Sequence, residues 1–156
     1  MAATLNSPTA KAVEAYVAEF ARFESEHPAS PWLSQKRREA IDRFAEIGFP
    51  TVRDEEWKYT DITPAANLAV TPIFKPHLNG AATQIAQSLP FGDIAAHRLV
   101  FVNGHYAPEL SQLTELPAGV TVEPFSQALL NEGEVIKANF GKIADIDNET
   151  FLTLNT

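Results

Sequence analysis

The chain has 156 residues, a formal net charge of −8 and no cysteine. This length suits one domain, or one domain with a short extension, and a hydrophobic content of 45% is enough for a real core. The lack of cysteine excludes disulfides, thiolate nucleophiles and thiolate metal ligands. The acidic balance argues against nucleic-acid binding, because that binding needs clustered cations to neutralise phosphates.

The acidity is concentrated in the second half of the chain. Residues 1–78 contain nine Lys or Arg and eleven Asp or Glu, whereas residues 79–156 contain three and nine. The one basic cluster, Lys36-Arg37-Arg38, falls in a predicted helix beside acidic residues, so we interpret it as a solvated helix face. No apolar run approaches the roughly 20 residues of a spanning helix, and the start lacks the pattern of a signal peptide. We therefore expect a soluble, cytoplasmic protein with no membrane partner.

Two helices are predicted at the start of the chain. Ser7-Pro8 and Ser30-Pro31 each place a capping serine before a proline at the first helical position. Apolar residues then recur at steps of three and four, which predicts one apolar stripe on each helix. The stripes are Val13, Tyr16, Val17, Phe20 and Phe23 in the first helix, and Leu33, Ala40, Ile41, Phe44 and Ile47 in the second. Gly48 is placed to end the second helix, and the short turn between the helices predicts an antiparallel or steeply crossing pair.

The segment from Phe49 to Phe91 is interrupted by five prolines, which rule out a long helix there. We expect short elements instead. They are a helical turn from Thr63-Pro64, an edge strand over Leu68–Phe74 and a helix over Ala81–Leu89.

The clearest strand signal is Arg98–Val102, which is followed by Asn103-Gly104. Asn-Gly tolerates the positive φ of both central positions of a type I′ turn, so the pattern predicts a hairpin. A further strand is expected over Val120–Phe125, then a helix capped by Ser126 and an amphipathic helix over Glu134–Ile143.

The order of these elements indicates an α+β fold, with an N-terminal helical pair, then a small sheet that contains the hairpin, then further helices. We expect residues 1–48 to form the helical pair and residues 49–156 to form a small α+β region. The last six residues include Phe151, Leu152 and Leu154 with no polar tail. A terminus usually ends in polar residues, so we expect the chain to be cut at the edge of a further domain.

Four histidines and one carboxylate run are the candidates for chemistry. The histidines lack the close spacing of a helical metal site, and we interpret them as structural; they are His27, His77, His97 and His105. The run Asp54-Glu55-Glu56, with Asp61, contains enough oxygens for magnesium or acid–base work, but adjacent residues in one turn do not guarantee convergence, so a charged turn is preferred. Phosphate-binding glycine loops and nucleophile elbows do not occur. We therefore predict no catalytic, cofactor-binding or metal-binding residue, no cofactor, and no enzyme activity.

The stretch Gly48-Phe-Pro-Thr-Val-Arg-Asp-Glu-Glu-Trp-Lys-Tyr-Thr60 resembles a segment at the start of the SufB/SufD family of iron-sulfur cluster assembly proteins. Leu99-Val-Phe-Val-Asn-Gly-His-Tyr106, running on to Leu110-Ser111, is similar to a strand and hairpin of that family. The ending Phe151-Leu-Thr-Leu-Asn-Thr156 is similar to the family's approach to its large central domain. Within the family, the spacing and the loosely helical opening favour the N-terminal region of the SufD branch.

This resemblance implies a chain that corresponds to about the first third of a family member, and a right-handed β-helix domain and a terminal helical region follow in that family. It implies a non-catalytic scaffold subunit whose partners are a SufB-like subunit and a SufC-like ATPase. The resemblance also implies that the contacts with the ATPase lie in the later domains. No functional residue is carried over to this chain.

The matched aromatic residues have two interpretations. The preferred one is structural, since Trp57 and Tyr59 bury large apolar bodies and leave their polar tips hydrogen-bonded. The alternative is that Trp57, Lys58 and Tyr59 face a partner, because aromatic residues beside a cation are frequent interface anchors.

Two other functions compete with the scaffold. One is a free-standing small-molecule-binding domain or enzyme that uses the carboxylates between Asp54 and Asp61 with a histidine, which a pocket lined by those groups would support. The other is a helix-turn-helix nucleic-acid binder built from the first two helices, which the overall charge disfavours.

Overall fold

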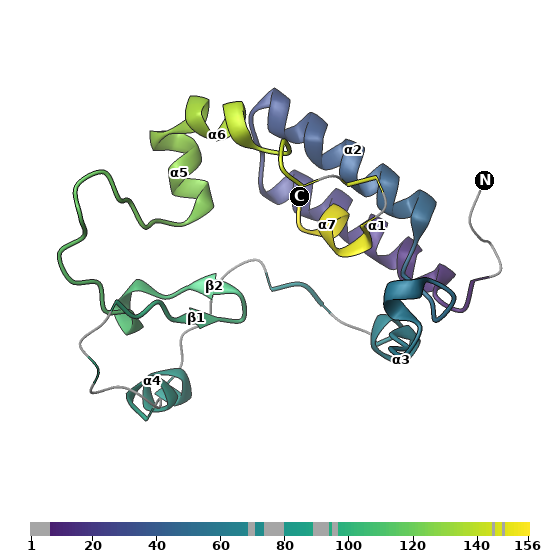
Figure 1. Cartoon of the computed structure of the whole chain (residues 1–156), viewed down its shortest axis with the longest axis horizontal. Helices are drawn as coiled ribbons and strands as arrows, with labels where there is room; N and C mark the ends of the chain where they lie inside the picture. Colours follow the sequence, from purple (N-terminus) through teal and green to yellow (C-terminus); the bar gives the residue numbers. More distant parts are fainter. Residues whose placement is uncertain are drawn as a thin grey trace. The chain divides into compact units, whose positions relative to one another are not determined.

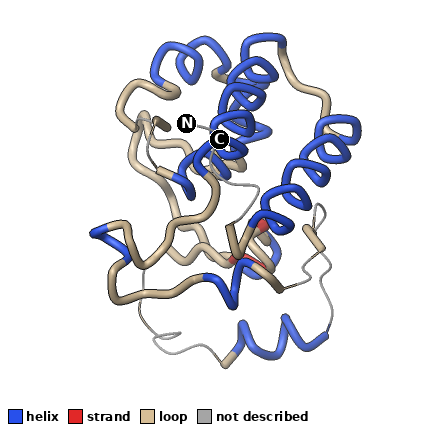
Figure 2. Tube along the Cα trace, turned by 90° about the vertical axis from the view of Figure 1, so that its right-hand side faces the viewer, coloured by secondary structure: helices blue, strands red, loops and turns tan. Residues whose placement is uncertain are grey.

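The computed structural model describes residues 7–68, 71–73, 80–88, 94, 97–144, 146–147 and 149–156. Helices and loops make up most of this trace, and two short strands form one antiparallel hairpin (Figures 1 and 2). The α+β prediction and the N-terminal helical pair are confirmed. The helices are α1 (Ala10–Glu26), α2 (Pro31–Ile47), α3 (Thr63–Ala66), α4 (Gly80–Gln87), α5 (Phe125–Asn131), α6 (Gly133–Asn139) and α7 (Thr150–Leu154), with 3-10 turns at Glu55–Trp57 and Pro108–Leu110. The strands are β1 (Phe101–Val102) and β2 (His105–Tyr106).

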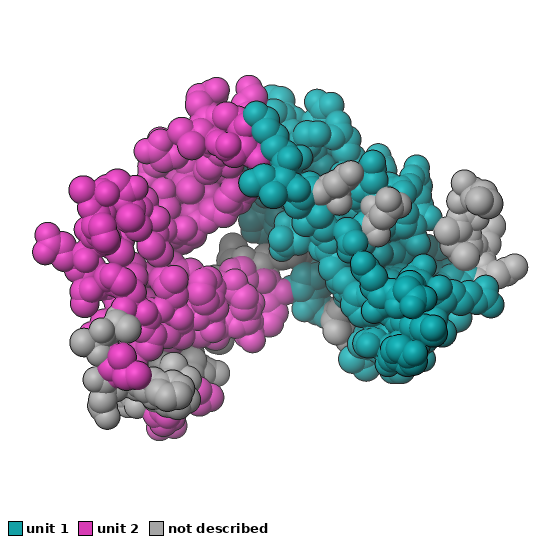
Figure 3. Space-filling model, viewed as in Figure 1, with its two compact units in different colours: residues 1–72, 140–156 teal, residues 73–139 magenta. Residues whose placement is uncertain are grey.

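The chain forms two compact units (Figure 3). Unit 1 combines residues 1–72 with residues 140–156, and unit 2 consists of residues 73–139. Unit 1 is therefore discontinuous in sequence. The predicted division of the protein into residues 1–48 and 49–156 stays a prediction.

The two long helices of unit 1 have different starts. Helix α2 begins at Pro31 with Ser30 as its N-cap, as predicted, although the Ser30 hydroxyl makes no capping hydrogen bond. Helix α1 begins at Ala10 with Thr9 as its N-cap, so the prediction that Pro8 is the first helical residue is wrong. The Ser7 hydroxyl hydrogen-bonds the Thr9 hydroxyl at 3.0 Å instead, which is a local competitor of the expected cap.

Gly48 ends α2 as predicted. Its φ is +68°, a left-handed conformation that costs glycine little, and its N–H donates to the Phe44 carbonyl at 2.8 Å. The chain turns sharply after Gly48, so that Phe49 packs into the core against α2. Phe49 is 6% exposed there.

The core of unit 1 lies between α1, α2 and α7. Phe44 is fully buried, and its ring centroid lies 6.0 Å from that of Tyr16 and 5.2 Å from that of Phe49. Helix α7 packs on α2, and the Thr150 hydroxyl donates to the Gly48 carbonyl at 2.7 Å (Figure 1). The predicted stripes supply most of this core, because Leu33, Ala40, Ile41 and Phe44 are buried and Val13, Tyr16, Val17 and Phe20 pack against it.

Unit 2 contains α4, the hairpin, α5 and α6. The hairpin prediction is confirmed: Asn103 has φ +50° and Gly104 φ +81°, and Val102 pairs with His105. The strand is shorter than predicted, since Arg98 forms only an isolated bridge with Gln112. The predicted helix over Ala81–Leu89 is found as α4, with Leu89 outside the described residues.

Three predictions for other segments differ from the structure. Residues 120–124 form no strand, and Ser126 lies inside α5 rather than capping it, because the helix starts at Phe125 after Pro124. The predicted helix over Glu134–Ile143 ends at Asn139, since Gly141 has φ +72°, which is incompatible with a helix. In the predicted strand over Leu68–Phe74, Leu68 and residues 71–73 are not in a strand, and the others lie outside the described residues.

None of the helices in the described part of the chain combines the length and the apolarity needed to cross a membrane.

Candidate functional site

The turn that follows α2 is built around Asp54. One carboxylate oxygen, Oδ2, accepts from the Thr51 N–H at 2.7 Å and from the Thr51 hydroxyl at 3.1 Å. The Trp57 N–H then donates to the Asp54 carbonyl at 2.8 Å, which starts the 3-10 turn over Glu55–Trp57. Asp54 therefore holds a turn, and the turn sets the direction of the aromatic residues after it.

These aromatic residues form an exposed surface in unit 1. Trp57 is half-buried, and its ring centroid lies 5.4 Å from that of Phe151, which is 46% exposed. Tyr59 is 91% exposed, and the Lys58 ammonium lies 5.7 Å from its ring centroid. The preferred interpretation that both aromatic bodies are buried is therefore wrong for Tyr59 and holds only in part for Trp57. We call Trp57, Lys58, Tyr59 and Phe151 the aromatic surface.

The carboxylates between Asp54 and Asp61 serve their own turns. Asp61 Oδ1 accepts from the Thr63 N–H at 2.9 Å, and hydrogen bonds from the Thr63 backbone and side chain lower the pKa of Asp61. Glu55 lies 3.9 Å from the Lys58 ammonium. These contacts fit the charged turn that the sequence favoured. In the part of the chain that the structure describes, no three His, Cys, Asp or Glu side chains are grouped for a metal ion.

The histidines are used locally. His27 stacks on Phe23, with ring centroids 4.7 Å apart, and its Nδ1 lies 3.2 Å from the Phe23 carbonyl. His97 Nδ1 accepts from the Thr114 N–H at 3.3 Å, and His105 Nε2 donates to the Ile73 carbonyl. His77 lies outside the described residues. The described histidines thus make local contacts, and their interpretation as structural residues stays a prediction.

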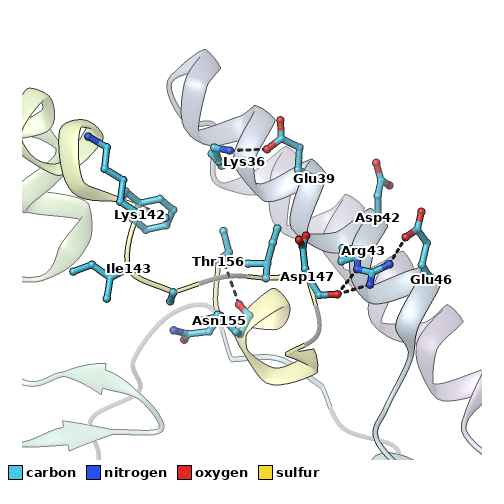
Figure 4. Close-up of a pocket in the computed structure, with 15 residues that line it drawn as sticks. Lys36, Glu39, Asp42, Arg43, Glu46, Lys142, Ile143, Asp147, Asn155 and Thr156 are labelled. Atoms are coloured by element: carbon cyan, nitrogen blue, oxygen red, sulfur yellow. Dashed lines mark hydrogen bonds and ion pairs between the residues drawn. The ribbon is translucent and has the colours of Figure 1, made fainter.

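An open cavity of about 800 Å³ lies in unit 1 between α2 and the C-terminal segment (Figure 4). Charged, uncharged polar and apolar residues all contribute to its lining. Its residues are Lys36, Glu39, Asp42, Arg43 and Glu46 from α2, and Phe140, Gly141, Lys142, Ile143, Ala144, Ile146, Asp147, Leu152, Asn155 and Thr156 from the later segment. None of the carboxylates from Asp54 to Asp61 lines it, so the alternative function that depends on them gains no support here.

Charges in the cavity wall are largely paired with one another. Lys36 Nζ donates to Glu39 at 2.8 Å, and this bond, with a second from Gln35, lowers the pKa of Glu39. Arg43 donates to Glu46 at 2.7 Å and, through Nε, to the Asp147 carbonyl at 2.6 Å (Figure 4). The described residues lining the cavity include no histidine, serine or cysteine.

Sequence reasoning did not find this cavity. The sequence predicts only a solvated helix face for the α2 residues in its wall. The other wall comes from residues more than 90 positions later in the chain. The one local signal is the spacing of Glu39, Asp42, Arg43 and Glu46, which places them on one side of the helix.

The sequence profile of the SufBD protein N-terminal region matches residues 10–156. The chain belongs to the SufBD family. It is similar to an iron-sulfur cluster assembly SufBD family protein of Synechocystis sp., with 32% identity over 124 residues. That match covers 80% of this chain and 26% of the relative, so the chain spans about a quarter of the relative's length. No solved structure matches the chain significantly.

The region matched by the SufBD profile contains all three sequence motifs that resemble the family. It includes the turn and aromatic surface after α2, the Asn103-Gly104 hairpin and the α7 segment. The resemblance to the SufB/SufD family is thereby confirmed.

Proposed function

We propose that the chain acts as the N-terminal region of a SufD-like subunit in a cytoplasmic iron-sulfur cluster assembly complex, in a scaffold and interaction role without catalysis. Its partners are a SufB-like subunit and a SufC-like ATPase, reached through the full-length subunit. Neither nucleic acid nor a membrane is a partner in this proposal. The observation that carries it is the SufBD match over residues 10–156, which includes nearly all of both units.

The chemistry of the chain supports a non-catalytic role. A cluster is held by thiolates in most iron-sulfur proteins, and this sequence has no cysteine. The carboxylates that were candidates for acid–base work accept hydrogen bonds from their own turns, as Asp54 and Asp61 do.

An interaction role is supported by the aromatic surface. Tyr59 exposes nearly its whole side chain beside Lys58, and Phe151 exposes almost half. Aromatic groups next to a cation are frequent anchors of protein interfaces. We assign this surface to contacts within the assembly complex.

The test compares the full-length subunit with residues 1–156. Each is titrated by calorimetry with the SufC-like ATPase, and circular dichroism checks that residues 1–156 are folded. We expect the full-length subunit to bind the ATPase and residues 1–156 not to bind it. Anaerobic reconstitution of residues 1–156 with iron and sulfide is expected to give no stoichiometric cluster.

Two results would count against this function. If the full-length subunit purifies with neither the SufB-like nor the SufC-like protein, the proposed complex is wrong. If folded residues 1–156 bind the ATPase at micromolar affinity or tighter, the ATPase site lies in this region. Tyr59→Ala would then be the first variant to examine, with Leu68→Ala as its control, because Leu68 is also exposed (63%) in unit 1 but lies outside the aromatic surface.

A further inference from the structure

Unit 2 buries very little of itself. Among the residues of unit 2 whose side chains the structure describes, only Ala107 is buried, whereas Phe101 is 59% exposed, Leu130 80% and Leu99 44%. Large apolar groups that stay in water contribute nothing to the stability of a fold. Unit 2 therefore presents apolar groups that an additional polypeptide can cover.

The hairpin of unit 2 also has one open edge. Arg98 and Gln112 exchange two backbone hydrogen bonds of 2.7 and 2.8 Å, and the Ala107 N–H donates to the Val100 carbonyl at 2.9 Å. Main-chain groups alternate in direction along a strand, so those of Leu99 and Phe101 face the opposite edge. In the part of the chain that the structure describes, no hydrogen bond is found for the main-chain groups of Leu99, or for those of Phe101 at that edge.

The main chain and the side chains at this edge both fit an added β-strand. Unpaired N–H and C=O groups in a row accept an added strand. The exposed side chains of Leu99 and Phe101 are two positions apart, so they lie on one face of the ribbon and would pack against alternate residues of that strand. Helices cannot satisfy both requirements, because their backbone groups are already bonded internally.

We infer that the edge at Leu99 and Phe101 docks an extended, alternately apolar segment from the remainder of the full-length subunit, which adds a strand to the hairpin. This inference rests on the proposed function, in which the chain is the N-terminal region of a longer subunit. About three quarters of the Synechocystis relative lies outside the matched region.

A segment of the same polypeptide is a more favourable occupant of this edge than a separate partner or a second copy. A segment of the same polypeptide reaches the edge at a high effective concentration, whereas a short two-residue strand offers little area to a separate molecule. A second copy would also bring together two units of like charge, since residues 73–139 hold three Lys or Arg against six Asp or Glu.

The experiment is amide-resolved hydrogen exchange on the full-length subunit alone, at two concentrations tenfold apart. We expect the Leu99 and Phe101 amides to exchange at least 100-fold more slowly than unstructured amides, equally at both concentrations. In Phe101→Lys this protection should fall at least tenfold, because a charge on the strand opposes edge pairing. Leu130→Lys is the matched control: it puts the same charge on another exposed side chain of unit 2 and should leave the protection unchanged.

Each other outcome overturns the inference. Exchange at the unstructured rate means that the edge is free. Protection that rises with concentration assigns the edge to a second copy, and protection that appears only with the SufB-like subunit assigns it to that partner. An equal loss in Leu130→Lys means that the hairpin is protected by the general stability of unit 2. Since the subunit is measured alone, a failure of complex formation leaves this result intact.

Discussion

The two units differ in how completely they bury similar aromatic side chains. Unit 1 encloses Phe44 completely and packs two aromatic rings, Tyr16 and Phe49, against it, whereas unit 2 leaves Phe101 more than half exposed. Helices α1 and α2 have 17 residues each, and α5 and α6 have seven each. Only the longer helices present an apolar stripe of several turns to a neighbour, which is the main source of helix stability in proteins. Unit 1 therefore has an apolar core of its own, whereas the described residues of unit 2 bury little apolar surface.

This difference is measurable because the two units carry different probes. Both tryptophans, Trp32 and Trp57, lie in unit 1. Tryptophan fluorescence therefore follows the unfolding of unit 1, and amide exchange in the hairpin follows unit 2.

The largest effect is expected from Phe44→Ala in unit 1. Removing a fully buried ring leaves a cavity among Tyr16 and Phe49, and such changes lower the free energy of unfolding by about 3–5 kcal/mol. Urea denaturation followed by tryptophan fluorescence measures the loss. Phe101→Ala is the counterpart in unit 2, where exposure predicts a change within about 0.5 kcal/mol, measured by amide exchange in the hairpin. Equal losses in the two variants would remove the contrast between the units.

The sequence predicted the elements whose signals are local. The stripe from Leu33 to Phe44 repeats at the helical period, and Asn103-Gly104 matches one turn type, so both were found. Val120–Phe125 has the apolar pattern of a strand as well, but strands need a neighbour, and residues 120–124 have none in the described part. Long-range contacts also decide the exposure of Tyr59 and the contribution of residues 140–156 to the cavity, so the sequence predicted neither.

Gly104→Val tests whether the hairpin is the element that holds unit 2 together. A Cβ at Gly104 meets no atom within 4 Å, so the penalty comes from the φ of +81° alone. We expect a loss of about 1–3 kcal/mol, seen as faster exchange of the Ala107 amide. Gly133→Ala is the control, since Gly133 also has open space but no positive φ and begins α6. If both variants exchange alike, the turn does not limit the stability of unit 2.

Thr150→Val tests how firmly the C-terminal segment is attached to unit 1. The Thr150 side chain is only 8% exposed and its hydroxyl bonds the Gly48 carbonyl, so the isosteric valine removes one hydrogen bond and keeps the volume. The expected loss is about 1 kcal/mol in the tryptophan-monitored unfolding of unit 1. Thr60→Val, at an exposed threonine of unit 1 whose hydroxyl makes no hydrogen bond in the described structure, should leave the midpoint unchanged. An unchanged midpoint in Thr150→Val would mean that α7 is held by apolar contacts alone.

The smallest effect is expected from Asp61→Asn, and its pH dependence identifies it. Hydrogen bonds from Thr63 lower the pKa of Asp61 in the folded chain, so ionised Asp61 favours folding at pH values above the unfolded pKa of about 3.9. That contribution is lost as the pH falls through the lower, folded pKa. Because asparagine keeps an acceptor oxygen without the charge, the urea midpoint of Asp61→Asn should lie slightly below wild type at pH 7 and converge with it as the pH falls below about 3.9. Asp42→Asn, at a carboxylate with no ion pair or hydrogen bond in the described residues, should leave the urea midpoint at pH 7 unchanged. A difference for Asp61→Asn that stays constant from pH 7 to pH 2 would mean that the charge of Asp61 does not stabilise the turn before α3.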